Sequence, residues 1–144
     1  MKDAPGQMEF VRCSKCTRYL PETYFHAQKA AKKGKLQAWC KPCRRVYALE
    51  RRHKIRDEVL SAYGARCLCC GETMKEFLTI DHIHGGGRQH RLSLGSMTAT
   101  TFYEWLRREG FPQNDFRCLC MNCNFARGIY GHCPHERTAA HVAD

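Results

Sequence analysis

Four Cys-x-x-Cys pairs are the feature that most limits how this chain can fold. The pairs are Cys13/Cys16, Cys40/Cys43, Cys67/Cys70 and Cys120/Cys123. Two such pairs make one tetrahedral four-cysteine zinc site, because each short turn presents two thiolates to the same ion. The four pairs therefore predict two structural Zn²⁺ ions, and four thiolates leave neither ion an open position for water.

The segment between Cys43 and Cys67 indicates which pairs share an ion. Spacing alone does not decide, because 23 residues separate Cys16 from Cys40 and another 23 separate Cys43 from Cys67. The second gap has no proline and only a late glycine, and Pro42 suits a first helical turn. A helix of about 20 residues is about 30 Å long and would hold Cys43 away from Cys67. We therefore expect one ion on Cys13, Cys16, Cys40 and Cys43, and the other on Cys67, Cys70, Cys120 and Cys123.

This pairing divides the chain into three parts and predicts a small, zinc-dependent α+β protein. Residues 1–45 form a four-cysteine zinc ribbon, residues 46–62 a basic connecting helix, and residues 63–144 a second zinc module. Neither module is large enough to rely on a big hydrophobic core, so each zinc should contribute strongly to folding.

The cysteine count also bears on the compartment. Eleven cysteines is an odd number, and the first residues lack the apolar core of a signal peptide, so we expect a reducing cytoplasm and no disulfides. No apolar run reaches the ~18 residues of a membrane span, so we expect no membrane partner. Three cysteines outside the pairs stay open between packing thiols and further ligands, with His135 as a companion ligand: Cys69, Cys118 and Cys133.

The second module has a readable order of elements. A β-favouring run at 77–80 leads to Asp81-His82 and then to a turn of three glycines, 85–87. Thr101-x-x-Glu104 resembles a capping box and predicts a helix that ends at Gly110. A second strand is expected at 116–119, and a helix after Cys123 should end near Gly128 or Gly131.

Asp81 and His82 have the residue types needed to cleave a phosphodiester. The reaction needs a nucleophile, a positioned base and neutralisation of charge on the phosphate. A neutral histidine can act as the base near pH 7, and a carboxylate can hold Mg²⁺. The dipeptide alone is common in proteins, so its meaning depends on the sequence around it.

That surrounding sequence resembles the HNH endonucleases, and in particular their phage-type, endonuclease VII-like branch. The resemblance covers nearly the whole chain and is carried by several motifs in the same order. These are Cys67-Leu68-Cys69-Cys70-Gly71-Glu72, Phe77-Leu78-Thr79-Ile80-Asp81-His82-Ile83, Gly85-Gly86-Gly87, Phe102-Tyr103-x-Trp105-Leu106 and Leu119-Cys120-Met121-Asn122-Cys123-Asn124-Phe125-Ala126. The N-terminal ribbon is similar to the four-cysteine region that precedes this domain in such phage proteins.

The resemblance implies a ββα-metal fold in residues 63–144, braced by the second zinc. It implies that Asp81 and Asn124 bind a catalytic Mg²⁺ or Mn²⁺ and that His82 activates the attacking water. Cleavage would then leave 5′-phosphate and 3′-hydroxyl ends, in the host cytoplasm if the protein is phage-encoded. His84 is a further catalytic candidate, as a contact to the scissile phosphate or the metal, against the alternative of a solvated loop residue. Asn114 stays open between a site role and turn chemistry.

Charge favours DNA, most readily double-stranded, as the partner. The formal net charge is +10, and the segment 29–56 holds many basic residues and the single acid Glu50. Such one-sided charge suits contact with a phosphate backbone. Candidate DNA-binding residues there and in the loop after the glycines are Arg44, Arg45, Arg51, Arg52, Lys54, Arg88 and Arg91, with His90 beside them.

Two other classes of function compete with the nuclease. A non-enzymatic zinc-finger regulator that binds nucleic acid would account for the ribbon and the basic helix. A zinc adaptor that binds another protein would show binding insensitive to salt. Neither gives a reason for Asp81-His82 and Asn124 to accompany the cysteine framework, so the endonuclease is the preferred hypothesis.

Overall fold

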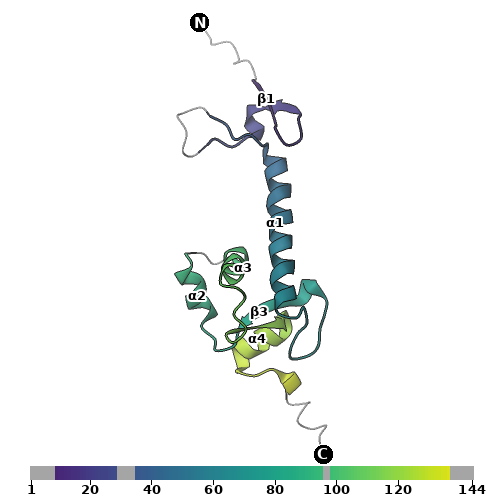
Figure 1. The fold of residues 1–144 in the computed structure, drawn as a ribbon, viewed down its shortest axis with the longest axis vertical. Helices are drawn as coiled ribbons and strands as arrows, with labels where there is room; N and C mark the ends of the chain where they lie inside the picture. The colour runs from purple at the N-terminus through teal and green to yellow at the C-terminus, as the bar shows by residue number, and fades with distance from the viewer. Residues whose placement is uncertain (1–8, 29–34, 96–97, 137–144) are drawn as a thin grey trace, which may run out of the picture. The chain divides into compact units, whose positions relative to one another are not determined.

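The structure is a computed structural model that describes residues 9–28, 35–95 and 98–136 (Figure 1). Contacts between Cα atoms divide the chain into two compact units, Met1–Arg51 and Arg52–Asp144. None of the helices in these described ranges is long and apolar enough to cross a membrane.

The first unit is a small ribbon built around cysteines. Strands β1 (Phe10–Arg12) and β2 (Tyr19–Pro21) pair in antiparallel fashion, with Val11 opposite Leu20. A single turn of 3-10 helix, η1 (Glu22–Tyr24), follows β2. The buried side chains are those of Cys13, Phe25 and Cys40. An apolar core this small cannot stabilise a fold by itself, which agrees with the expectation that a metal does so.

Helix α1 (Lys41–Ala62) begins ahead of the predicted start at residue 46, with Pro42 in its first turn. Its last turns bury Ile55, Val59 and Leu60 in the core of the second unit. The predicted domain boundary at residue 63 therefore differs from the structural division after Arg51. The two boundaries differ because the last turns of α1 pack on apolar side chains of the second unit and so belong to its core.

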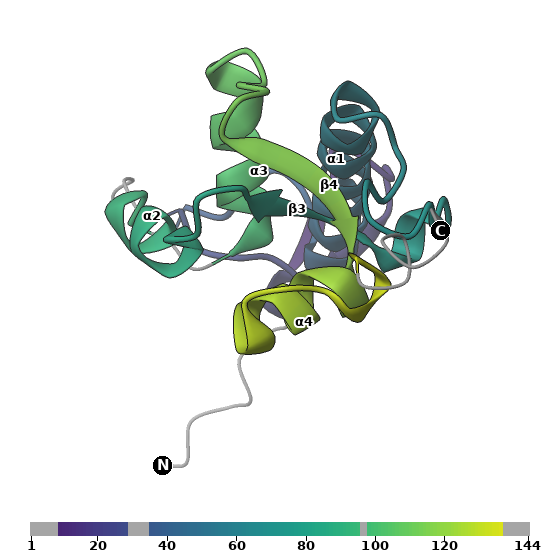
Figure 2. The ribbon, with the colours of Figure 1, turned by 90° about the horizontal axis from the view of Figure 1, so that it is seen from below.

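The second unit contains a two-stranded sheet followed by a helix. Strands β3 (Leu78–His82) and β4 (Phe116–Cys120) pair in antiparallel fashion, with Asp81 opposite Arg117. Helix α4 (Met121–Tyr130) follows β4 directly and packs against both strands (Figure 2). The predicted order of strand, long excursion, strand and helix is confirmed, but the helix begins at Met121, ahead of the predicted start after Cys123, so the last cysteine pair spans the end of β4 and the first turn of α4. A one-turn 3-10 helix, η2 (Lys75–Phe77), precedes β3.

The excursion between the strands holds two helices, α2 (Gly87–Ser93) and α3 (Ala99–Arg108). The sequence did not indicate α2, because its glycine-rich start resembles a flexible turn. The predicted capping box at Thr101 is wrong in register. Thr98 caps α3, and its side-chain oxygen accepts a hydrogen bond of 3.3 Å from the backbone N–H of Thr101. Gly110 follows the end of α3 as predicted, with a φ of 72°.

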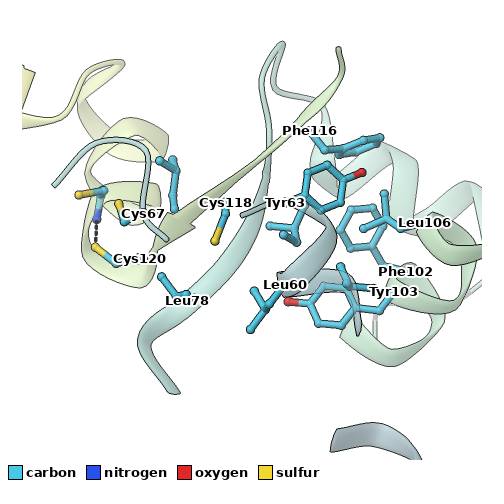
Figure 3. Close-up of a cluster of buried hydrophobic side chains, with 14 of the residues drawn as sticks. Leu60, Tyr63, Cys67, Leu78, Phe102, Tyr103, Leu106, Phe116, Cys118 and Cys120 are labelled. Carbon is cyan, nitrogen blue, oxygen red and sulfur yellow. Dashed lines mark hydrogen bonds between the residues drawn. The ribbon is translucent and has the colours of Figure 1, made fainter. Parts of the chain in front are cut away.

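The core of the second unit lies between the sheet, α3 and the end of α1 (Figure 3). Phe102 and Leu106 are buried there and Trp105 packs against it, so these residues form the core-facing side of α3. The phenol of Tyr63 donates a hydrogen bond of 3.1 Å to the carbonyl of Pro112. Cys118 is fully buried on β4 within this core, so the structure assigns it to packing.

Replacement of Leu60 by alanine tests the contribution of α1 to the second unit. Leu60 is 0% exposed, so Leu60→Ala should lower the free energy of unfolding by about 2–5 kcal/mol. Leu92→Ala is the control, since Leu92 is 54% exposed and its loss should cost less than about 0.5 kcal/mol. Urea unfolding followed by circular dichroism measures both, and equal effects would contradict the placement of α1 in this core.

Candidate metal centres and active site

The first cysteine group lies in the N-terminal unit. The sulfur atoms of Cys13, Cys16, Cys40 and Cys43 all lie within 4.8 Å of one another. A metal bound by thiolates at about 2.3 Å, as zinc is, places neighbouring sulfurs about 3.8 Å apart. The distance between the sulfurs of Cys16 and Cys40 is 4.0 Å, so the group could hold such a metal.

The second group has the same construction and lies where β4 meets α4. It consists of Cys67, Cys70, Cys120 and Cys123. The sulfurs of Cys70 and Cys120 are 3.7 Å apart, and the backbone N–H of Cys123 donates to the sulfur of Cys120 at 3.4 Å. The structure thus brings together the two sets of four that the sequence paired.

Backbone N–H groups favour the thiolate form at Cys13 and Cys16 of the first group and at Cys67 of the second. Burial raises the pKa of Cys13, but hydrogen bonds from the backbone of Cys16, Cys40 and Lys15 outweigh it and bring the pKa to about 6. Burial likewise raises the pKa of Cys67, and backbone hydrogen bonds led by that of Cys70 lower it to about 6. Thiolates are the form of cysteine that binds metals.

A pocket of about 270 Å³ lies in the second unit, among β3, the glycine turn, α2, α3 and α4. Three of its lining residues are the predicted catalytic residues Asp81, His82 and Asn124. Arg88 and Arg91 line it as well. The pocket is therefore bordered by oxygen ligands, an imidazole and positive charge. The remaining lining residues are Thr79, Ile80, Gly85, Gly87, Ala99, Phe102 and Tyr103.

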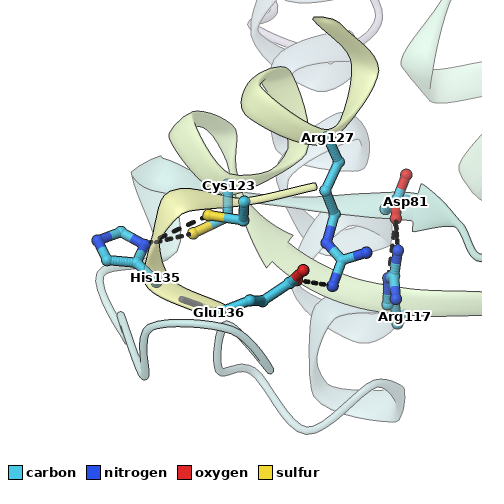
Figure 4. Close-up of polar contacts among 7 residues, drawn as sticks. Asp81, Arg117, Cys123, Arg127, His135 and Glu136 are labelled. Carbon is cyan, nitrogen blue, oxygen red and sulfur yellow. Dashed lines mark hydrogen bonds and ion pairs between the residues drawn. The ribbon is translucent and has the colours of Figure 1, made fainter. Parts of the chain in front are cut away.

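Asp81 is held by an ion pair that crosses the sheet. Its Oδ2 lies 2.8 Å from both Nη2 and Nε of Arg117, the residue opposite it in the register (Figure 4). Both side chains are largely shielded, with 15% exposed for Asp81 and 19% for Arg117. No local sequence pattern marks Arg117, because its role depends on the strand register.

His82 is fixed by a second histidine and by aromatic rings. Its Nε2 lies 2.9 Å from Nδ1 of His90, its ring stacks on Phe102 with centroids 5.0 Å apart, and Phe116 meets it edge-on at 4.7 Å. Burial lowers the pKa of His82, and His90 and Arg91 lower it further, which together outweigh the opposite effect of the Asp81 carboxylate. The imidazole is therefore neutral at pH 7, as a general base requires.

Arg91 supplies a donor suited to an anion. Its Nε is buried and has no hydrogen-bond partner among the described residues, although a buried donor left unpaired is costly. Arg88, on the first turn of the same helix, is exposed at the rim of the pocket.

Other predicted residues lie elsewhere. His84 is exposed beyond the end of β3 and is not among the residues that line the pocket, and Asn114 is exposed in the turn before β4. The predicted DNA-binding residues of α1 are all exposed: Arg44, Arg45, Arg51, Arg52 and Lys54. Their roles stay predictions. His90, a candidate for contact with a DNA backbone, lies against His82, with its Nδ1 2.9 Å from Nε2 of His82.

A comparison of the chain with protein-family models, curated proteins and solved structures found no match. The fold and the two cysteine groups therefore describe a small α+β protein that could bind metal.

Substitution of Gly87 tests the packing of His82. A Cβ at this position would lie 2.9 Å from Nδ1 of His82, closer than side chains tolerate. Because Phe102 and Phe116 confine the ring, Gly87→Ala should displace it and shift the NMR signals of the His82 imidazole. Gly128→Ala is the control, since a Cβ there meets no described atom within 4 Å. Unchanged His82 signals in Gly87→Ala would contradict this geometry.

Proposed function

We propose that this protein is a metal-dependent DNA endonuclease of the HNH type, with a ββα-metal fold in its second unit. The observation that carries the proposal is the pocket in which Asp81 and His82, from β3, meet Asn124, from the first turns of α4. Arg88 and Arg91 give the same pocket the positive charge that a phosphodiester requires.

His82 would act as the general base. In the tautomer that serves this role, Nε2–H of His82 would donate to Nδ1 of His90, 2.9 Å away, and the lone pair on Nδ1 of His82 would accept the proton. This tautomer would leave the basic nitrogen beside Gly87, a residue that lines the pocket. Water deprotonated by His82 would attack the phosphorus, and the 3′ oxygen would leave, giving 5′-phosphate and 3′-hydroxyl ends.

Asp81 and Asn124 fit a hard divalent cation, because both can offer side-chain oxygens to the pocket. A bound Mg²⁺ or Mn²⁺ would neutralise charge on the phosphate and on the leaving oxygen. Arg117 orients the Asp81 carboxylate through Oδ2 and balances its charge across the strands. Arg91, which lines the pocket, would donate guanidinium N–H groups to a phosphate oxygen.

The two four-cysteine groups would hold structural Zn²⁺. Four thiolates close the coordination of each ion, so neither would take part in the reaction. In the second unit Cys123 directly precedes Asn124 on α4, so the zinc would position a ligand of the catalytic metal.

The exposed basic residues of α1 would bind the DNA backbone. They carry no sequence information by themselves, so they would supply affinity and leave the choice of the cut to other contacts. The competing function, a non-enzymatic zinc-finger regulator, would use the same helix and would leave the pocket without a purpose.

A supercoiled-plasmid assay tests the catalytic role of His82. Wild-type protein with Mg²⁺ or Mn²⁺ should nick or linearise the plasmid. His82→Ala should lower the rate by roughly 10²–10⁴-fold, the usual contribution of a general base, while zinc content and fold are kept. His26→Ala, at an exposed histidine of the first unit, is the matched control and should cut as wild type. Absence of wild-type cleavage of DNA or RNA with every divalent metal would contradict the proposal.

The salt dependence of binding tests the role of α1. Arg52→Gln should weaken DNA binding and reduce the slope of log K against log salt by about 0.9 for one lost phosphate contact. Glu50→Gln, on the same exposed helix, removes a negative charge and should leave the slope unchanged. Fluorescence anisotropy on duplex DNA across a salt series measures both. Equal slopes for Arg52→Gln and wild type would contradict a contact between Arg52 and a DNA phosphate.

A further inference from the structure

A third group of metal-binding side chains is present among the described residues, outside the pocket. It consists of Cys69, Cys123, Cys133 and His135, whose ligand atoms lie within 4.8 Å of one another. Cys123 also belongs to the second four-cysteine group, so the two groups share one sulfur. The group therefore adjoins the metal site already described and has three side chains of its own.

The distances within this group suit a tetrahedral ion. Nδ1 of His135 lies 3.3 Å from the sulfur of Cys123 and 3.4 Å from that of Cys133 (Figure 4). Zinc binds sulfur at about 2.3 Å and imidazole nitrogen at about 2.0–2.1 Å, which places the two ligand atoms about 3.5 Å apart. The His135 imidazole therefore lies at a suitable distance to be the fourth ligand, with the sulfurs of Cys69, Cys123 and Cys133, of one ion.

The chain path brings these ligands together through contacts that need no metal. Helix α4 ends at Gly131, which has a φ of 75° and turns the chain back. Glu136 then pairs with Arg127 of α4, and its backbone N–H donates to the carbonyl of Cys133 at 3.0 Å. Cys133 is only 1% exposed as a result.

The Cys67–Cys70 turn explains how Cys69 reaches a different group from Cys70. The turn is held by a hydrogen bond of 3.0 Å from the N–H of Gly71 to the carbonyl of Cys67. Another, also 3.0 Å, joins the N–H of Leu68 to the carbonyl of Cys118 on β4. In this fixed turn the consecutive side chains of Cys69 and Cys70 lie in separate ligand sets.

We infer that Cys69, Cys123, Cys133 and His135 hold a third zinc ion, bridged through the Cys123 thiolate to the ion on Cys67, Cys70 and Cys120. A thiolate has enough lone pairs to bind two ions, and the shared sulfur leaves each ion with four ligands. The added charge of the ion is offset by the thiolates of Cys69 and Cys133, which lose their protons on binding. This inference rests on the zinc site proposed for the second unit and is independent of nuclease activity.

The bridged pair would fasten both ends of α4. One ion would join the first turn of α4 to the end of β4 and to the Cys67–Cys70 turn. The other ion would join the first turn of α4 to the segment after Gly131. Because Asn124 follows the bridging residue, the pair would restrict the movement of a residue that lines the pocket. The third ion is structural, since its four ligands leave no position for water.

Zinc content per chain tests the third ion. Wild-type protein, measured by native mass spectrometry and by elemental analysis, should hold three zinc ions. His135→Ala and Cys133→Ser should each hold two and stay folded by circular dichroism. His132→Ala, at a neighbouring histidine outside the group, is the matched control and should hold three. Two ions in the wild type, with no change in His135→Ala, would overturn the third site alone. A single ion in the wild type would overturn the second four-cysteine site as well.

Cobalt substitution tests the bridge. Two Co²⁺ ions that share a thiolate couple magnetically, so the wild-type protein should show less Co²⁺ EPR intensity than its cobalt content predicts. His135→Ala should restore full intensity per ion, because it lacks the neighbouring ion, and His132→Ala should match the wild type. Full intensity in a wild-type protein that holds three ions would overturn the sharing of Cys123.

Discussion

The junction between β4 and α4 is the constraint on which the second unit depends. Cys120 ends the strand and caps the helix, with its sulfur accepting a hydrogen bond of 3.4 Å from the N–H of Cys123. Both cysteines belong to the four-cysteine group, so one turn of chain both starts the helix and supplies metal ligands. Asn124 comes next on the helix and lines the pocket, so the geometry of the pocket depends on this junction.

Side-chain contacts fix the two pocket residues that come from β3, Asp81 and His82. Asp81 and Arg117 face each other across β3 and β4 and neutralise each other's charge. His82 is confined by Phe102 and Phe116, and its Nε2 is engaged by His90 from α2. A carboxylate and an imidazole on adjacent residues are thus each oriented by a partner from another element, Arg117 of β4 for Asp81 and His90 of α2 for His82, which leaves their remaining atoms for a ligand.

Local sequence patterns predicted the cysteine groups and several elements. Contacts that depend on strand pairing and on tertiary packing could not be predicted from them. The grouping of the cysteines, the strand that ends in Asp81-His82 and the helix after the last pair followed from local patterns. The ion pair of Asp81 with Arg117 depends on strand register. The contact of His82 with His90 depends on helix α2, which the sequence did not indicate because its glycine-rich start resembles a turn. The boundary near residue 63 differed because burial of Ile55, Val59 and Leu60 is a tertiary effect. Cys133 and His135 could be grouped with Cys69 only when the turn after α4 was known.

Binding of Mn²⁺ to the zinc-loaded protein is the most direct test that the pocket is a catalytic metal site. An EPR titration should show one Mn²⁺ bound by the wild type and weaker binding by Asn124→Ala. Asn122→Ala, at an exposed residue in the same helical turn, should bind as the wild type does. Equal Mn²⁺ affinity in Asn124→Ala and Asn122→Ala, or no binding by the wild type, would contradict the account of this protein as a metal-dependent nuclease.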